Sequence, residues 1–415
     1  MVIRTIIFII MLWLGSAATG LHAQETAQQP DQSTVASVSD ASVSDEGVSD
    51  KGVSSERDGW QIKPRWRLQY DIAEIDGPAG LPGQGRFSAI RRARLGVDIS
   101  MPAGLSARID GEVQDGPVQL IDAYLMWNKN NVFVMAGQQK AINPLDLHSS
   151  NLNTSFQERP AFYTAFNYGR GTGVMVGYER DDIGIYGGVF TDTLVNLNDV
   201  KSNSISTDFR TFWSPQLGNL RLHLGGSYHW RDLNDFANVP TRYRQRPFVR
   251  ITNTRYIGTP ALSVDREERY GLEVATVSGR FHSAAEVHWL DASRPGLADP
   301  TLFGGYGEVG FFLTNDSRPL KGGVFGGIKP KKPLGSGGFG AVQVNVRYDY
   351  LDLNSAGVTG GKQDGYLASL IWTPVEFLRL MVNYARLDYS DAAVAVAGDR
   401  DYTVDVIGMR FQISY

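Results

Sequence analysis

The chain has 415 residues, of which 20% are charged and 11% aromatic, and it contains 46 glycines and no cysteine. The lack of cysteine excludes disulfides, thiolate catalysis and cysteine-ligated metals, and it suits a protein exported through an oxidising compartment. The mean hydropathy of −0.21 and the net charge of −4 do not indicate a bundle of spanning helices. Such an average fits a membrane barrel, in which lipid-facing and lumen-facing residues alternate.

The first residues are typical of a secretory signal peptide. Arg4 precedes an apolar run over residues 5–14, and small residues follow as far as Ala23. A basic start, a short apolar core and small residues before a cleavage point define this class of targeting segment. The apolar run is too short to span a membrane as a helix. We therefore expect residues 1–23 to be removed on export.

Residues 24–58 form a polar, low-complexity segment with three near-repeats of Val-Ser-Asp. The segment contains eight acidic and two basic residues, so most of the net negative charge of the chain lies there. A segment of this composition cannot bury enough apolar surface to order itself. We expect a disordered periplasmic arm, with or without a partner that it binds.

From Trp60 to the C-terminus the sequence alternates between polar and apolar residues. In residues 92–100 the even positions are mainly polar and include Arg92 and Arg94, whereas the odd positions are apolar. Successive side chains of a strand point to opposite faces, so this pattern predicts strands with one apolar and one polar face. The predicted strands are 60–70, 88–101, 105–114, 118–127, 132–138, 173–179, 183–190, 208–214, 220–230, 269–277, 281–290, 305–314, 339–351, 365–373, 377–389 and 402–415.

The connections between these strands alternate between short and long, with exceptions at residues 115–117 and 315–338. Aromatic residues gather at strand ends, and the last strand ends in Tyr415. Short periplasmic turns, long outer loops and aromatic girdles are features of transmembrane barrels, and a soluble sandwich has no reason to keep them. We therefore predict that residues 59–415 form a closed, all-β, antiparallel transmembrane barrel of about 16 strands. Such a barrel closes on itself because every backbone group must be satisfied within the membrane.

Strand alternation assigns several arginines to the inner face. The opposite assignment is unfavourable, because an arginine that faces lipid at the midplane costs about 2–4 kcal/mol. Two interpretations of these side chains remain open. They form a path for anions, or they pair with inward acids and make a wall with no net field. The pore-lining set comprises Arg65, Arg67, Arg92, Arg94, Arg108, Arg221 and Arg347.

Three connections carry further candidates for a pathway. Residues 139–170 occupy the position at which porin loops fold inward, and Lys140, Glu158, Arg159 and Arg170 either constrict the pore or anchor the loop. Residues 231–268 carry a set of arginines whose planar forks suit phosphate and carboxylate oxygens, either as an anion funnel or as a lipopolysaccharide contact. This set is Arg242, Arg244, Arg246 and Arg250. The periplasmic connection contains Lys329, Lys331 and Lys332. It either folds toward the exit of the lumen or forms a solvated turn.

The chain resembles the phosphate-selective porin O and P family. The resemblance spans from about Trp60 to Tyr415 in order and includes Arg91-Arg92-Ala93-Arg94-Leu95-Gly96, although Asn315-Asp316 replaces the usual Gly-Glu. The other matching segments are 120–125, 137–140, 156–159, 244–247, 312–319 and 381–384. Membership implies a sixteen-stranded, trimeric outer-membrane channel with arginines along an anion path.

We therefore expect an outer-membrane porin for passive diffusion of small anions, with phosphate as the favoured solute. The alternatives are a general, weakly selective porin and a structural barrel whose arm binds a periplasmic partner. The expected partners are a homotrimer, outer-membrane lipid and lipopolysaccharide, and the barrel assembly machinery. We find no catalytic constellation, no cofactor or metal motif and no helix suited to nucleic acid, so we expect no enzyme.

Overall fold

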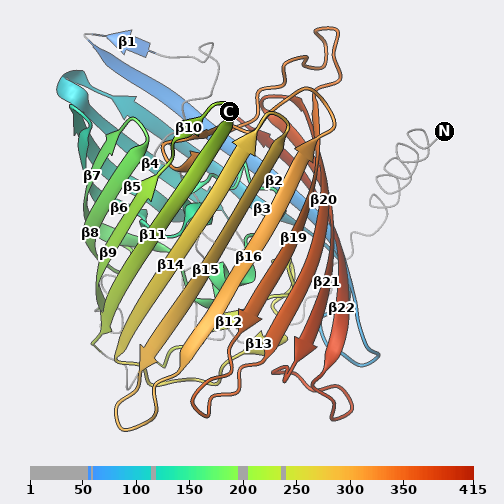
Figure 1. Ribbon diagram of the computed structural model, residues 1–415. Coiled ribbons are helices and arrows are strands. Elements are labelled where there is room, and N and C mark those ends of the chain that lie inside the picture. Colours follow the sequence, from blue (N-terminus) through green and yellow to red (C-terminus); the bar gives the residue numbers. More distant parts are fainter. Residues whose placement is uncertain (1–54, 58, 114–117, 195–203, 235–239) are drawn as a thin grey trace. The chain divides into compact units, whose positions relative to one another are not determined.

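The computed structural model describes residues 55–57, 59–113, 118–194, 204–234 and 240–415. The predicted signal peptide and most of the predicted arm lie outside these residues. Sixteen long antiparallel strands form one closed barrel (Figure 1), as the sequence predicts. The barrel strands are β2 (Trp60–Asp76), β3 (Gly85–Ser100), β4 (Leu105–Val113), β5 (Val118–Lys129), β6 (Val132–Lys140), β7 (Arg170–Arg180), β8 (Ile183–Thr191), β9 (Ser204–Trp213), β11 (Leu220–Leu233), β14 (Arg266–Ser278), β15 (Phe281–Ser293), β16 (Thr301–Phe312), β19 (Ala341–Asp352), β20 (Lys362–Val375), β21 (Leu378–Ser390) and β22 (Tyr402–Ser414).

The barrel closes between its first and last long strands. β2 pairs with β22 from Arg67 opposite Ser414 to Asp76 opposite Asp405. The smaller elements lie at the ends of the barrel or in its connections. They are β1 (Ser55–Arg57), which pairs with β2, β10 (Gln216–Leu217), β12 (Arg244–Gln245), β13 (Ile257–Gly258), β17 (Leu320–Lys321), β18 (Val324–Phe325), the 3-10 helix η2 (Pro102–Gly104), α2 (Leu145–His148) and α3 (Ala161–Ala165). The last residues of the predicted arm therefore include a short strand.

The outer surface of the barrel is apolar in its middle zone. Leu95 is 70% exposed, and Ile109 and Val346 are similarly exposed outward positions on other strands. Their neighbours in sequence point inward and are buried, as the alternation predicts. No helix among the described residues is long and apolar enough to cross a membrane.

Several strands run further toward the outer end than the sequence pattern predicts. β2 continues to Asp76 rather than ending at Tyr70, and β9 begins at Ser204 rather than Asp208. In the extra part of β2, Ala73 and Ile75 point inward and are buried, and Glu74 lies on the opposite face. The alternation thus reverses at the outer end, where the strands leave the membrane band and pack against loops inside. A prediction that assumes apolar residues outside and polar residues inside along the whole strand therefore places the ends of these strands too early.

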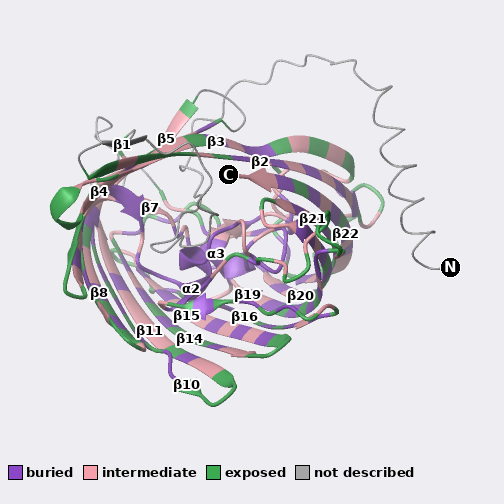
Figure 2. Ribbon diagram, turned by 90° about the horizontal axis from the view of Figure 1, so that it is seen from above, coloured by how far each residue is buried: buried purple, intermediate pink, exposed green. Residues whose placement is uncertain are grey.

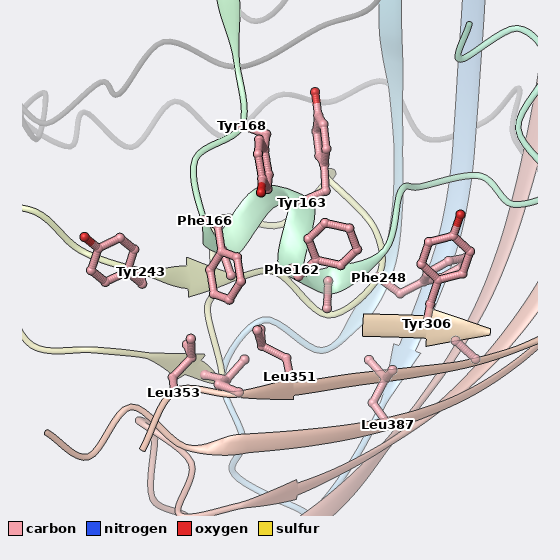
Figure 3. Close-up of a cluster of buried hydrophobic side chains, with 14 of the residues drawn as sticks. Phe162, Tyr163, Phe166, Tyr168, Tyr243, Phe248, Tyr306, Leu351, Leu353 and Leu387 are labelled. Atoms are coloured by element: carbon pink, nitrogen blue, oxygen red, sulfur yellow. The ribbon is translucent and has the colours of Figure 1, made fainter. Parts of the chain in front are cut away.

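The outer half of the lumen is filled by a hydrophobic core rather than by water alone. Phe162 of α3 and Phe166, the C-terminal cap of α3, are fully buried. They pack among buried side chains that include Leu351, Leu353 and Leu387 (Figure 3). Burial of side chains of this size contributes about 1.5–3 kcal/mol each. The expectation of a uniformly polar inner face is therefore wrong at this end of the barrel.

The long connection 313–340 interrupts the row of short periplasmic turns. Its first part contains the β17–β18 hairpin, and Val324 and Phe325 are buried. Phe325 N donates to Ser149 Oγ (3.1 Å), and Arg210 Nη2 donates to Gly323 O (3.1 Å). This part of the connection therefore enters the barrel, where it contacts the connection 141–169 and the wall.

Candidate functional site

The connection between β6 and β7, residues 141–169, folds into the barrel and is called the inner loop below. Its helices α2 and α3 lie inside the ring of strands when the barrel is viewed along its axis (Figure 2). Hydrogen bonds attach it to β2, β15, β16, β19 and β21. These bonds are Arg67 Nη1 to Asn151 Oδ1 (2.8 Å), Leu145 N to Glu286 Oε2 (2.9 Å), Ser155 Oγ to Glu308 Oε1 (2.7 Å), Ala161 N to Asp349 Oδ2 (3.0 Å) and Arg379 Nη1 to Leu152 O (2.6 Å).

Two of the four predicted constriction residues, Lys140 and Arg159, bond the inner loop, and a third, Arg170, joins two wall strands. Lys140 Nζ donates to Leu147 O (2.5 Å), and Arg170 makes a two-pronged ion pair with Asp122 (2.8 and 3.1 Å). Arg159 pairs with Asp146 Oδ2 at 2.5 Å. These contacts favour the anchoring interpretation for Lys140 and Arg159, whereas Arg170 belongs to the wall. Arg159 also lies beside the cavity described below, as does Glu158.

The arginines predicted on the inner face do point inward, and most of them pair with carboxylates. We call the set on β2–β5 and β7 the charged wall: Arg65, Arg94, Arg108 and Arg170 with Asp98, Asp110, Glu112 and Asp122. The closest pairs are Arg108 Nε to Asp98 Oδ1 (2.6 Å), Arg94 Nη2 to Glu112 Oε2 (2.7 Å), Arg170 Nε to Asp122 Oδ1 (2.8 Å) and Arg65 Nε to Asp98 Oδ2 (3.4 Å). The wall therefore has compensated charge, which agrees with the second interpretation of the sequence.

The other predicted pore arginines have similar partners. Arg92 donates to Gln69 Oε1 (3.0 Å) and lies 3.8 Å from Glu112. Arg347 pairs with Glu308 (2.7 Å) deep inside the barrel, and Arg67 bonds the inner loop. Arg221 pairs with Asp182 (2.6 Å) in a partly exposed position beside the short turns.

Arg91 also points into the barrel, although strict alternation along the strand assigns it to the outer face. Gln69 pairs with Arg92 and Tyr70 pairs with Ile90, so Arg91 is the extra residue of a bulge in β3. A bulge shifts the alternation by one residue, and Arg91 and Arg92 are both buried on the inner side. The signal was present in the sequence. Strict alternation would have put Arg91 against lipid at a cost of about 2–4 kcal/mol, which a bulge removes.

A small cavity lies between β3, the inner loop and the connection 234–265, and we call it the arginine cavity. Four guanidinium groups line it, those of Arg91, Arg92, Arg159 and Arg250. The rest of its lining is Asn151, Thr154, Gln157, Glu158, Tyr163 and Thr164. Among the described residues, no acceptor bonds Arg91 Nη1, Asn151 Nδ2, Gln157 Nε2 or Arg250 Nε, and no donor bonds Gln157 Oε1, although all five atoms are buried. The cavity thus has a surplus of donors.

Glu158 is the carboxylate of this cavity. It accepts from Arg91 Nε (2.7 Å) and Nη2 (3.3 Å) and from Arg410 Nη2 (3.1 Å). Burial opposes its ionisation, but Arg91 and Arg410 hold the pKa of the Glu158 carboxyl well below its usual range. Arg410 also pairs with Asp71 (2.7 Å), whereas Arg250 has no carboxylate within ion-pair distance in the described part of the chain. Burial and the nearby Arg91 lower the pKa of Arg250 to about 10.

The arginines predicted at the outer mouth belong to the connection 234–265. Arg246 donates to Thr252 O (2.8 Å) and Asn253 Oδ1 (3.0 Å), and Arg255 donates to Asn253 O (3.1 Å). Burial and neighbouring arginines lower the pKa values of Arg246 and Arg255 to about 10. Arg244 is part of β12, and Arg242 is exposed. In the described ranges, no carboxylate lies within ion-pair distance of the guanidinium groups of Arg242, Arg246 or Arg255.

The predicted exit lysines lie on the periplasmic rim of the barrel rather than beside the cavity. Lys329 pairs with Glu376 (3.1 Å) in the turn between β20 and β21, and Lys331 and Lys332 lie on the surface. The inward histidines are hydrogen-bonded to wall or loop residues, for example His229 to Asp208 (2.7 Å) and His223 to Glu273 (2.9 Å). No cluster of ligands suited to a metal ion occurs among the described residues.

A closed sixteen-stranded barrel with an apolar outer band and an inward-folded loop defines the class of outer-membrane porins. The chain belongs to the phosphate-selective porin O and P family, which it matches over residues 62–415. The protein is therefore a porin of the bacterial outer membrane, from a family and fold of channels that are typically not enzymes.

Known proteins of related sequence or fold agree with this membership. An uncharacterized protein of Caulobacter vibrioides is 43% identical over 364 residues, which cover 85% of this chain and 74% of that protein. The anion-selective porin of Comamonas acidovorans has a similar fold, with a TM-score of 0.55 at 12% identity over 86% of this chain and all of that chain. The outer-membrane channel DcaP of Acinetobacter baumannii gives a TM-score of 0.53 at 12% identity over 88% of this chain and 99% of that one.

Proposed function

We propose that this porin carries small anions by passive diffusion, with phosphate as the favoured solute. The observation that carries the proposal is the arginine cavity, which four arginines and one acid line and in which Arg250 has no carboxylate within ion-pair distance among the described residues. Guanidinium forks bind phosphate and carboxylate oxygens through charge-assisted hydrogen bonds. The buried donors of Arg91 and Arg250 are placed to replace part of the hydration shell of a passing anion.

In this proposal the path runs from the outer mouth through the arginine cavity and then beside the charged wall. Arg242, Arg246 and Arg255 have no carboxylate partner in the described ranges, so they raise the local concentration of anions at the entrance. The cavity then selects by charge. The charged wall contributes a polar surface with little net field. Membership of the family, and the similar fold of the anion-selective Comamonas porin, support the same direction of selectivity.

The compensated wall favours a second candidate, a general porin with weak selectivity. If the charged wall, with its small net field, determines the selectivity, cations and anions pass almost equally. We further propose that the protein is a homotrimer with a cleaved signal peptide, and a trimeric form of OmpT from Vibrio cholerae, which has a similar fold at 12% identity, is consistent with this assembly. Contacts with lipopolysaccharide and with the barrel assembly machinery remain predictions.

The test is the reversal potential of the purified protein in a planar bilayer under a KCl gradient, followed by titration with phosphate. A potential on the chloride side together with block of the current by phosphate supports the anion pathway. A potential near zero or on the cation side overturns anion selectivity and leaves the general porin. Absence of conductance, both in the full protein and after removal of residues 24–54, would point to a structural barrel.

A further inference from the structure

The second part of the connection 313–340 turns back over the rim of the barrel, and residues 329–340 are called the rim turn. Leu334 N donates to Pro374 O (2.9 Å) at the end of β20, and Gly340 N donates to Lys332 O (2.9 Å). A side chain at Gly340 would collide with the backbone of Pro374, because its Cβ would lie 2.5 Å from Pro374 Cα. Glycine at this position therefore lets the turn sit close to the β20 end.

The rim turn lies on the lipid side of the wall. Trp372 is on the outward face of β20, in the same row as the exposed Tyr366 and Leu370. Phe339 stacks on Trp372 with ring centroids 4.9 Å apart, and Trp372 Nε1 donates to Phe339 O (2.8 Å). The turn is therefore continuous with the periplasmic aromatic girdle, which marks the level of the lipid headgroups.

The exposed side chains of the rim turn combine two chemistries. Leu334 and Phe339 remain 49% and 57% exposed, and Lys331 and Lys332 are exposed beside them. Among the described residues, the only acid within ion-pair distance of a lysine in the turn is Glu376, which pairs with Lys329. Among these residues the ammonium groups of Lys331 and Lys332 therefore have no acidic partner, and Asp316 accepts only the backbone N–H of Lys331 (2.7 Å). Basic residues next to exposed apolar side chains at a membrane boundary match the phosphates and acyl chains of anionic lipid.

We infer that the rim turn binds anionic phospholipid headgroups of the periplasmic leaflet, through Lys331 and Lys332, with Leu334 and Phe339 entering the headgroup region. This role differs from the pore exit predicted from the sequence, because the turn packs on the outer face of β20. The inference rests on the outer-membrane location of the barrel and not on the ion that it carries.

The chain has no cysteine, so one introduced thiol is a unique label. Leu334→Cys carrying an environment-sensitive fluorophore is reconstituted in nanodiscs of phosphatidylcholine with increasing phosphatidylglycerol and a headgroup-labelled quenching lipid. We expect a blue-shifted emission and quenching that grow with the anionic lipid. In a Lys331→Gln/Lys332→Gln background, the phosphatidylglycerol needed for half-maximal quenching should rise about fivefold for each lysine removed.

Lys129→Gln is the matched control, because this exposed lysine ends β5 on a distant part of the wall. Its removal should leave the signal at position 334 unchanged. Absence of quenching at every lipid composition, or equal quenching with and without the two lysines, would overturn the inference. A change of ion selectivity in the same variants is not expected, so failure of the lipid contact is distinguishable from failure of the proposed transport function.

Discussion

The charged wall and the arginine cavity use the same residue type in opposite ways. In the wall, Arg94 and Arg108 each have a carboxylate within 2.7 Å, so their charge is balanced and fixed. In the cavity, Glu158 is the acid of Arg91, and Arg250 has no carboxylate in ion-pair range among the described residues. The comparison shows that inward arginines alone do not make an anion path. An inward arginine without a nearby carboxylate is available to bind an anion, whereas a paired arginine is part of the structure of the wall.

The largest effect is expected for Arg94→Ala, which removes the nearest partner of the buried Glu112 and leaves the more distant Arg92 at 3.8 Å. Breaking a buried ion pair by removing one partner costs about 3–5 kcal/mol. We expect a lower midpoint of urea unfolding, measured by the mobility shift of the folded barrel on gels, and an unchanged reversal potential. A stable variant with altered selectivity would erase the distinction between the wall and the cavity.

Arg250→Ala should weaken the block by phosphate and leave the stability of the barrel almost unchanged, which is the opposite of Arg94→Ala. A hydrogen bond to a charged group contributes about 1.5–3 kcal/mol, so its loss should weaken block by phosphate about tenfold or more. Because Arg250 forms no ion pair with the described residues, we expect little change in unfolding. Bilayer titration with phosphate checks the first outcome, and urea unfolding checks the second. Unchanged block with reduced stability would assign Arg250 to the scaffold.

Glu158→Gln should sharpen the cavity by releasing Arg91 from its acid, whereas Arg410 keeps its ion pair with Asp71. We expect a reversal potential further toward the anion side and block by phosphate that is several-fold tighter, in line with the roughly 1–3 kcal/mol of one charge-assisted contact. Glu308→Gln, which alters another buried ion pair away from the cavity lining, is the matched control and should leave block unchanged. Weaker block in Glu158→Gln would contradict the proposed path.

The difference in phosphate block between the wild type and Glu158→Gln should depend on pH as the lowered pKa of Glu158 dictates. A depressed carboxyl pKa stabilises the folded state above the unfolded pKa of about 4.3, and this contribution is lost as the pH falls through the folded pKa. Glu158 therefore stays ionised at pH 4. We expect the contrast in phosphate block between the wild type and Glu158→Gln to persist from pH 7 to pH 4. Its disappearance near pH 5 would mean that the two arginines do not hold this carboxylate.

Arg221→Gln should have the smallest effect. Its pair with Asp182 is partly exposed, and exposed pairs contribute about 0–1 kcal/mol. We expect neither the unfolding midpoint nor the reversal potential to change measurably. A clear loss of selectivity would return Arg221 to the pore-lining group in which the sequence placed it.

The fold was predictable because strand alternation continues through most of the chain, and each of the sixteen strands is present. Prediction failed where the physical environment changes along a strand. Ala73 and Ile75 face inward because loops rather than water fill the outer lumen. The inward position of Arg91 depends on one bulge.

The site was less predictable than the fold, because charge compensation depends on neighbours across strands and loops. The pairing of Arg94 with Glu112 follows from adjacent positions in the β3–β4 register, so it could have been anticipated. The meeting of Arg91, Glu158 and Arg250 joins a strand with two long loops. Strand alternation contains no information on where those loops fold.

The seam between β2 and β22 has a consequence for biogenesis. Backbone bonds between Trp66 and Tyr415 (2.9 and 2.8 Å) join opposite ends of the barrel sequence, and Arg410 reaches Asp71 across the same seam at 2.7 Å. Contacts of such large sequence separation form late, because loop closure must precede them. The ring therefore cannot close before the last residues have been translated and exported. A chain cut short by one strand would leave two open edges, each a site for aggregation or for pairing with another chain.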